Sequence, residues 1–215
     1  MRKPSQLLLA SIGLALVVAG CSSTYYAAWE KVGVYKRDLL KKKVVAARDE
    51  QQTAGEQFKD ALTRLKELYG FDGGKLEKAY SGLQKDYDRS AASVEAVHKR
   101  IRDVETVAAD LFAEWEKEIK QISTPALQSA SRDQLRETRS RYDALHLALK
   151  RAEDSMEPVL AKLRDNVLFL KHNLNAQAIA SLKGEATNIQ ADISRLITEM
   201  NSSIAKADEF IKELK

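Results

Sequence analysis

Two short motifs place an acid and a histidine three residues apart, the spacing that di-iron helical bundles use. Glu95 and His98 form the first pair, and Asp143 and His146 form the second. Residues three apart lie on one face of a helix, so each pair could offer two ligands to a shared metal. Such a centre also needs inward-facing carboxylates from the other helices.

The surrounding residues argue against a metal centre. Valine, tyrosine and leucine occupy the apolar seam beside both motifs, which leaves the acids and histidines on its flanks. If the two segments pair about Pro125, His98 lies beside residue 154, and its axial offset from His146 is about 12 Å. We therefore expect no metal or other cofactor, and we interpret these side chains as solvated residues of helix faces.

Other catalytic patterns are also missing from the sequence. No glycine-rich loop follows a strand, no serine or threonine stands in a nucleophile elbow, and the glycines of 70–74 are too isolated to bind phosphate. We predict that the protein is not an enzyme.

Cys21 is the only cysteine, and it ends a segment with the features of a bacterial secretory signal. Arg2 and Lys3 give a basic start, an apolar run covers 7–19, and small residues precede the cysteine. A membrane-spanning helix needs about 20 apolar residues, which this run does not provide. Val-Ala-Gly-Cys resembles the lipobox of bacterial lipoproteins. The resemblance implies cleavage before Cys21 and acylation of its sulfur, for example with palmitate, and of its new amino group.

The signal divides the chain into three parts. Residues 1–20 are the predicted signal peptide, 21–24 the acylated cysteine with a short tether, and 25–215 a single all-helical domain. Ser22 stands where lipoproteins kept in the inner membrane often carry Asp. The sequence therefore favours the outer membrane, with the domain facing the periplasm and the inner membrane as the alternative.

Three aromatic residues follow the tether closely, namely Tyr25, Tyr26 and Trp29. Amphipathic rings settle at the depth of lipid headgroups, so these residues are candidates for a membrane-proximal interface. A basic cluster that includes Lys36 and Lys43 lies just beyond them and could attract anionic headgroups. The alternative is that the basic side chains form a solvated helix face and the rings form part of the bundle core.

Composition favours long helices over a mixed fold. Of 215 residues, 31% are charged and 7% aromatic, with only 9 Gly and 3 Pro. The formal charge of +4 falls to about +2 without the basic signal residues, which is too small to indicate nucleic-acid binding. With the one cysteine committed to lipid, no disulfide is possible.

Apolar residues recur in steps of three and four over four stretches, as in coiled coils. The stretches cover about 25–69, 76–122, 126–170 and 179–214. The first half of the first stretch is polar at the seam positions Lys36 and Lys43, so we expect looser packing there. We expect Trp115, a seam residue, to be buried. We also expect Pro158 to bend the third helix near Ser155.

The phase of the seam changes between 171 and 178, which predicts a turn over 172–175. Asn173 could adopt a left-handed helix stop, and Asn175 could cap the next helix. The competing turn is at 183–184, where Gly184 is a strong stop signal. The expected fold is all-α, an elongated antiparallel bundle or coiled coil of four long helices. A three-helix coiled coil with a flexible C-terminal segment is the alternative.

One apolar run, 167–170, would place side chains on several sides of the third helix. Either it fills the end of the bundle, or it marks a contact for a partner. The candidate partner surface comprises Phe169, His172, Asn173 and Asn175.

Four phrases together, at 26–33, 36–40, 112–116 and 165–176, resemble an uncharacterised family of proteobacterial proteins that are often predicted lipoproteins. This resemblance implies a helical cell-envelope protein and supplies no activity or functional residue. We therefore expect a lipid-anchored, non-enzymatic protein that binds another envelope component or self-associates, without nucleic acid. The alternative is a sensory or small-molecule-binding bundle with a pocket near the loosely packed half of the first helix.

Overall fold

The computed structural model describes residues 35–69, 76–173 and 175–214, and these residues form long helices. None of the helices in this part of the chain is long and apolar enough to cross a membrane. The helices are α2 (Lys36–Tyr69), α3 (Leu76–Ile119), α4 (Pro125–Asp154), α5 (Met156–His172) and α6 (Ala176–Glu213).

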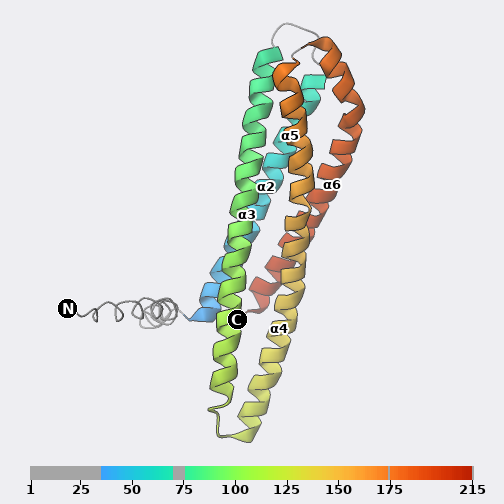
Figure 1. Ribbon diagram of the computed structural model, residues 1–215. Helices are drawn as coiled ribbons and strands as arrows, with labels where there is room; N and C mark the ends of the chain where they lie inside the picture. The colour runs from blue at the N-terminus through green and yellow to red at the C-terminus, as the bar shows by residue number, and fades with distance from the viewer. Residues whose placement is uncertain (1–34, 70–75, 174, 215) are drawn as a thin grey trace, which may run out of the picture.

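The helices form an elongated antiparallel bundle of four rods, in which α4 and α5 together make one interrupted rod (Figure 1). α2 packs between α3 and α6, and the α4–α5 rod closes the bundle by contacting both α3 and α6. The all-α bundle is confirmed. Because α6 packs on α2, α4 and α5, the three-helix alternative does not describe the chain.

The core follows the predicted seam closely. Side chains three and four residues apart face inward on each rod, and together they form one continuous apolar cluster along the bundle. Fully or almost fully buried members include Phe58, Leu65, Val97, Ile101, Leu149, Leu163, Ile193 and Leu196.

The third rod is interrupted at Ser155, as the position of Pro158 predicts. Proline has no N–H to donate to the carbonyl four residues earlier, and its ring crowds that turn. The Ser155 N–H donates to the Arg151 carbonyl over 3.2 Å, and its hydroxyl donates to the Ala152 carbonyl over 2.8 Å. The rod therefore bends without reversing direction, and α5 continues along the line of α4 (Figure 1).

The turn between α5 and α6 lies where the seam changes phase. α5 ends at His172 and α6 begins at Ala176, so Gly184 lies inside a helix. The expected left-handed stop is wrong, since Asn173 has a φ of −131°. Instead, the Asn173 side-chain amide donates to the Phe169 carbonyl over 2.9 Å and satisfies an otherwise open end of α5.

The first helix does not run unbroken from residue 25. α2 begins at Lys36, Tyr35 lies outside it, and the Asp38 carboxylate accepts a 3.4 Å hydrogen bond from the Tyr35 N–H. An acid at this position caps a helix start, a local signal that the apolar periodicity does not contain. The predicted stretch 25–34 lies outside the described residues.

Candidate functional site

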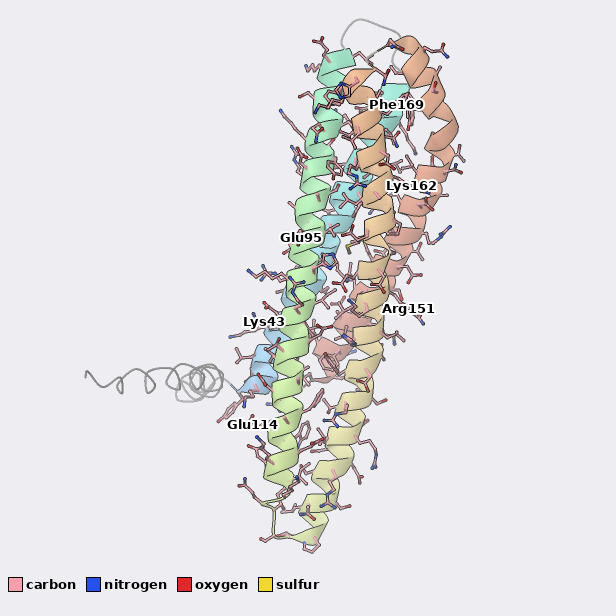
Figure 2. All side chains as sticks on the ribbon, in the orientation of Figure 1. Lys43, Glu95, Glu114, Arg151, Lys162 and Phe169 are labelled. Carbon is pink, nitrogen blue, oxygen red and sulfur yellow. The ribbon has the colours of Figure 1, made fainter. Side chains whose placement is uncertain are left out.

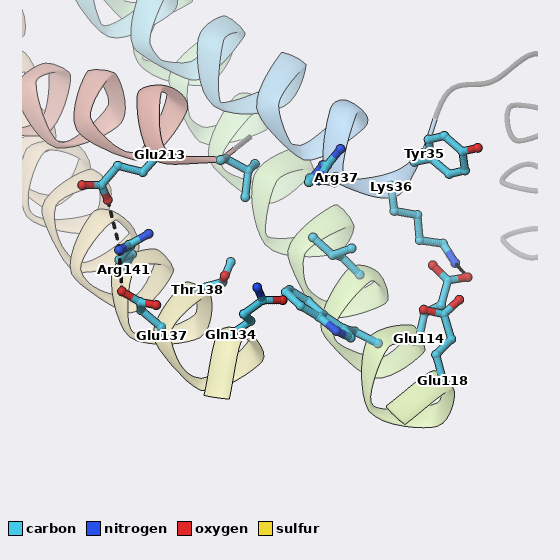
Figure 3. Close-up of a pocket in the computed structure, with 13 residues that line it drawn as sticks. Tyr35, Lys36, Arg37, Glu114, Glu118, Gln134, Glu137, Thr138, Arg141 and Glu213 are labelled. Atoms are coloured by element: carbon cyan, nitrogen blue, oxygen red, sulfur yellow. Dashed lines mark hydrogen bonds and ion pairs between the residues drawn. The ribbon is translucent and has the colours of Figure 1, made fainter. Parts of the chain in front are cut away.

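A cleft opens at the end of the bundle where α2 begins and α6 ends. α3 and α4 project beyond α2 and α6 at this end of the bundle (Figure 1). The cleft has a volume of about 750 Å³. Its walls come from α2, α3, α4 and the end of α6 (Figure 3), and they include Tyr35, Lys36, Arg37, Leu111, Glu114, Trp115, Glu118, Gln134, Glu137, Thr138, Arg141, Glu213 and Leu214.

Ion pairs fix the rim of the cleft. Lys36 at the start of α2 pairs with Glu114 of α3. On the opposite wall, Arg141 of α4 contacts Glu137 over 2.6 Å and Glu213 of α6 over 3.1 Å (Figure 3). These pairs hold the ends of α2 and α6 against the projecting helices.

The floor of the cleft is apolar. Leu111 and Leu214 are buried there, whereas Trp115 is only half-buried. The Trp115 indole N–H donates to the Ser131 hydroxyl of α4 over 2.9 Å, which fixes the ring between the two helices. The prediction that Trp115 is buried is therefore wrong, because the seam at this level has no partner from α2 among the described residues.

The cleft lies beside the half of the first helix for which the sequence predicts looser packing. Both polar seam residues of that half find acids on α3, and the Lys43 ammonium donates to Asp103 over 2.7 Å. The residues of the α4 wall were missed by the sequence interpretation. Polar Thr138 at a seam position was the available signal, since it marks a level where the core is incomplete.

An aromatic cluster lies on the helices α3, α4 and α6 next to residues that line the cleft. The Tyr142 ring meets the Phe112 and Phe210 rings edge-on, with centroids 5.5 and 6.3 Å away. Burial, with smaller contributions from the charges of Glu105 and Asp143, raises the pKa of Tyr142 to about 12. The phenol is therefore neutral at physiological pH, and the cluster ties α3, α4 and α6 together.

The two histidine motifs lie apart, as the register argument predicts. His98 reaches Glu153 of α4, one residue from the expected level, with Nδ1 2.5 Å from the carboxylate. His146 instead lies 2.7 Å from Glu105. The interpretation of His98 as solvated is wrong, because its side chain is 22% exposed and Glu153 only 5%. Among the described residues, no group of three His, Cys, Asp or Glu side chains could hold a metal.

The apolar run at 167–170 divides between core and surface. Val167 and Leu170 are buried, while Leu168 and Phe169 are 53% and 39% exposed. Phe169 lies near the end of the bundle opposite Glu114 and the cleft (Figure 2). His172, Asn173 and Asn175 are exposed beside it, and the Asn173 amide is already used by the end of α5.

The predicted lipidation and interface residues are not among those described. Cys21, Tyr25, Tyr26 and Trp29 all precede residue 35.

The described residues define the class of protein, an elongated helical bundle with a cleft at the end where α2 begins. The chain belongs to the family described as "Protein of unknown function (DUF2959)", whose profile matches residues 25–214. No curated protein matches the chain.

Proposed function

We propose that the chain is a lipid-anchored, periplasm-facing protein with a non-enzymatic binding, scaffolding or self-association role in the cell envelope. The observation that carries the proposal is the lipobox-like sequence ending at Cys21, followed closely by a stiff bundle. α3 has 44 residues, which corresponds to about 66 Å at 1.5 Å per residue. A rod of that length can present binding surfaces well away from an anchoring membrane.

The polar side chains support structure better than they support catalysis. His98 and His146 pair with acids on neighbouring rods, and Arg141 bridges α4 to α6. These contacts set the register between helices. The exposed Leu168 and Phe169 provide an apolar surface at the far end for a protein partner.

Processing of the precursor tests the anchor. In cells fed a palmitate analogue, the wild-type chain should be labelled and cut, and globomycin should cause the precursor to accumulate. Cys21→Ala should remain uncut and unlabelled, whereas the control Ser22→Ala should behave like wild type. A mature-sized, unlabelled product from Cys21→Ala would overturn the anchor.

Membrane choice and partner are tested separately. Fractionation should find the wild-type chain in the outer membrane, and Ser22→Asp should move it to the inner membrane. Photo-crosslinking from position 169, with the exposed position 147 as control, should capture one defined envelope protein or a second copy of the chain. Equal, diffuse capture from both positions would argue against a partner surface at Phe169.

Small-molecule binding is a second candidate, and the cleft itself favours it. A volume of about 750 Å³ lies in the range of ligand pockets, and the walls combine an apolar floor with amide, hydroxyl and charged groups. This function requires the cleft to be open in the full chain. A thermal-shift screen of wild type against Thr138→Trp, which would fill the cleft, tests that requirement.

A further inference from the structure

Ion pairs between α2 and α3 show how far along α3 the helix α2 packs against it. Arg64 contacts Asp86 over 3.1 Å, Lys43 contacts Asp103, and Lys36 contacts Glu114. The two helices are therefore antiparallel, and residues earlier in α2 contact residues later in α3. α3 continues past Glu114 to Ile119, and the chain then turns into α4. Among the described residues, only Tyr35 precedes Lys36, so this side of the bundle has no further residue to cover this last part of α3.

The uncovered part of α3 and α4 has the character of a core rather than of a surface. Trp115 is half-buried over a floor formed by Leu111 and Leu214. Nearby on α4, Leu127 is one of the most exposed large apolar residues described. An apolar floor with a large aromatic ring is normally covered by another chain segment.

A segment of suitable length and composition directly precedes, in the sequence, the residues at the mouth of the cleft. Tyr35 and Lys36 line its mouth, and residues 25–34 directly precede them. The part of α3 and the turn beyond Glu114, up to Ile122, spans about 12 Å, and ten residues span about 15 Å as a helix and more if extended. The family match begins at residue 25, so this segment belongs to the shared domain.

The segment also matches the cleft chemically. It carries three aromatic rings and two valines, and in the sequence Trp29 and Gly33 keep the three- and four-residue spacing that leads to the fully buried Leu40. Glu118 on the rim makes no ion pair with the described residues, and Lys31 offers a cation within the segment. Apolar rings can thus cover the floor while one lysine meets an acid at the rim.

We propose that residues 25–34 dock into this cleft, with Trp29 against the floor around Trp115. The cleft is then an intramolecular docking site for the N-terminal segment of the domain, and it is not a ligand pocket. The three aromatic rings of the segment face the cleft and do not form a membrane surface. One consequence rests on the proposed lipid anchor. Docking would bring Cys21 near the tip of the α3–α4 hairpin, so this tip would face the bilayer.

Photo-crosslinking of the full chain tests the docking directly. Benzoylphenylalanine at position 29, in protein purified from membranes into vesicles, should crosslink within the same chain to peptides from 111–141. The same group at the exposed position 147 should not reach the hairpin floor and serves as control. Lipid adducts from position 29, or dimers, would overturn the proposal. Because the crosslink does not require acylation, the full chain purified in detergent from whole cells should form it even if the lipid anchor is absent.

The accessibility of Trp115 gives a second, independent measurement. Trp29→Phe and Trp29→Asp both leave Trp115 as the single fluorescent indole, but only the aspartate should prevent docking. The acrylamide quenching constant of Trp115 should be about twofold higher in Trp29→Asp, because the ring loses the segment that covers it. Helix content and melting temperature confirm that both variants fold. Equal quenching in two folded variants would rule out coverage by this segment.

Discussion

His98 on α3 and Glu153 on α4 form a close pair, with Nδ1 2.5 Å from the carboxylate, and Glu153 stands just before the break of the third rod at Ser155. The carboxylate is almost fully buried and also accepts from the Lys150 ammonium. A buried charge of this kind is stable only with its partners in place. The pair therefore fixes the register of α3 against the interrupted rod.

His98→Ala should lower the free energy of unfolding by about 1–3 kcal/mol, since it leaves a buried carboxylate with one partner fewer. The matched control is His146→Ala, which breaks an equivalent pair with Glu105 whose side chains are 36% and 39% exposed. Exposed ion pairs contribute about 0–1 kcal/mol, so the control should change little. Urea unfolding of both variants measures the difference. Equal losses of unfolding free energy in the two variants would show that burial of Glu153 does not strengthen its pair with His98.

Gln51 on α2 and Ser203 on α6 are fully buried, and neither side chain has a hydrogen-bond partner among the described residues. Arg48 contacts Asp208, and Gly55 lies against Met200, so the antiparallel register places the two polar residues at one level. Both are seam residues, as the periodicity predicts, but they interrupt an otherwise apolar core.

Gln51→Leu should raise the free energy of unfolding by about 1 kcal/mol, because it removes a buried amide whose hydrogen bonds to water are not replaced. The exposed neighbour supplies the control, and Gln52→Leu should leave stability unchanged. Melting temperatures and urea midpoints provide the comparison. A loss of stability in Gln51→Leu alone would mean that the amide makes a bond essential to the fold.

Apolar periodicity was sufficient to predict the rods, because each rod must bury one stripe of side chains against its neighbours. The change in phase of the periodicity located the turn after His172, and Pro158 located the break at Ser155, since both are local properties of the chain. The start of α2 and the conformation of Asn173 depend on single side-chain-to-backbone hydrogen bonds, which periodicity does not report.

The cleft was only partly predictable. Polar seam residues such as Lys36 indicated looser packing near the start of the first helix. The cleft itself arises because α3 and α4 extend further than α2 and α6 at this end. That difference in length is set by where Asp38 caps α2 and where α6 ends. Half-burial of Trp115 and the pairing of Arg141 with Glu213 follow from it, and neither is visible in one helix considered alone.

Gly55 marks the close approach of α2 to α6. A Cβ atom placed there would lie 3.4 Å from the Ile197 Cδ1 and 3.6 Å from the Met200 sulfur, which is ordinary contact. Gly55→Ala should therefore raise stability by about 0.5–1 kcal/mol, since glycine is unfavourable within a helix. Gly55→Leu should lower it by about 1–3 kcal/mol through overpacking. Urea unfolding measures both, and a destabilising alanine would indicate a tighter interface.

Tyr142 makes the bundle sensitive to alkaline pH. Its pKa in the folded chain is about 12, against an ordinary value of 10.0, chiefly because burial disfavours the phenolate. The folded state thus holds this proton at a pH where the unfolded chain has lost it. The stabilisation is complete below pH 10 and is lost as the pH rises from 10 to 12. Since the side chain is partly exposed, screening reduces the effect to on the order of 1 kcal/mol.

Tyr142→Phe keeps the ring against Phe112 and Phe210 but has no proton to lose. Urea unfolding at pH 9 and at pH 11.5 should therefore show a smaller alkaline loss in the variant than in wild type. The hydrogen bond to Glu153 also raises the pKa of Lys150, and because this contribution is the same in both proteins it cancels in the difference. Ultraviolet titration of the folded chain should lose one late phenolate step in Tyr142→Phe. Identical pH profiles for the two proteins would show that Tyr142 ionises without opening the aromatic cluster.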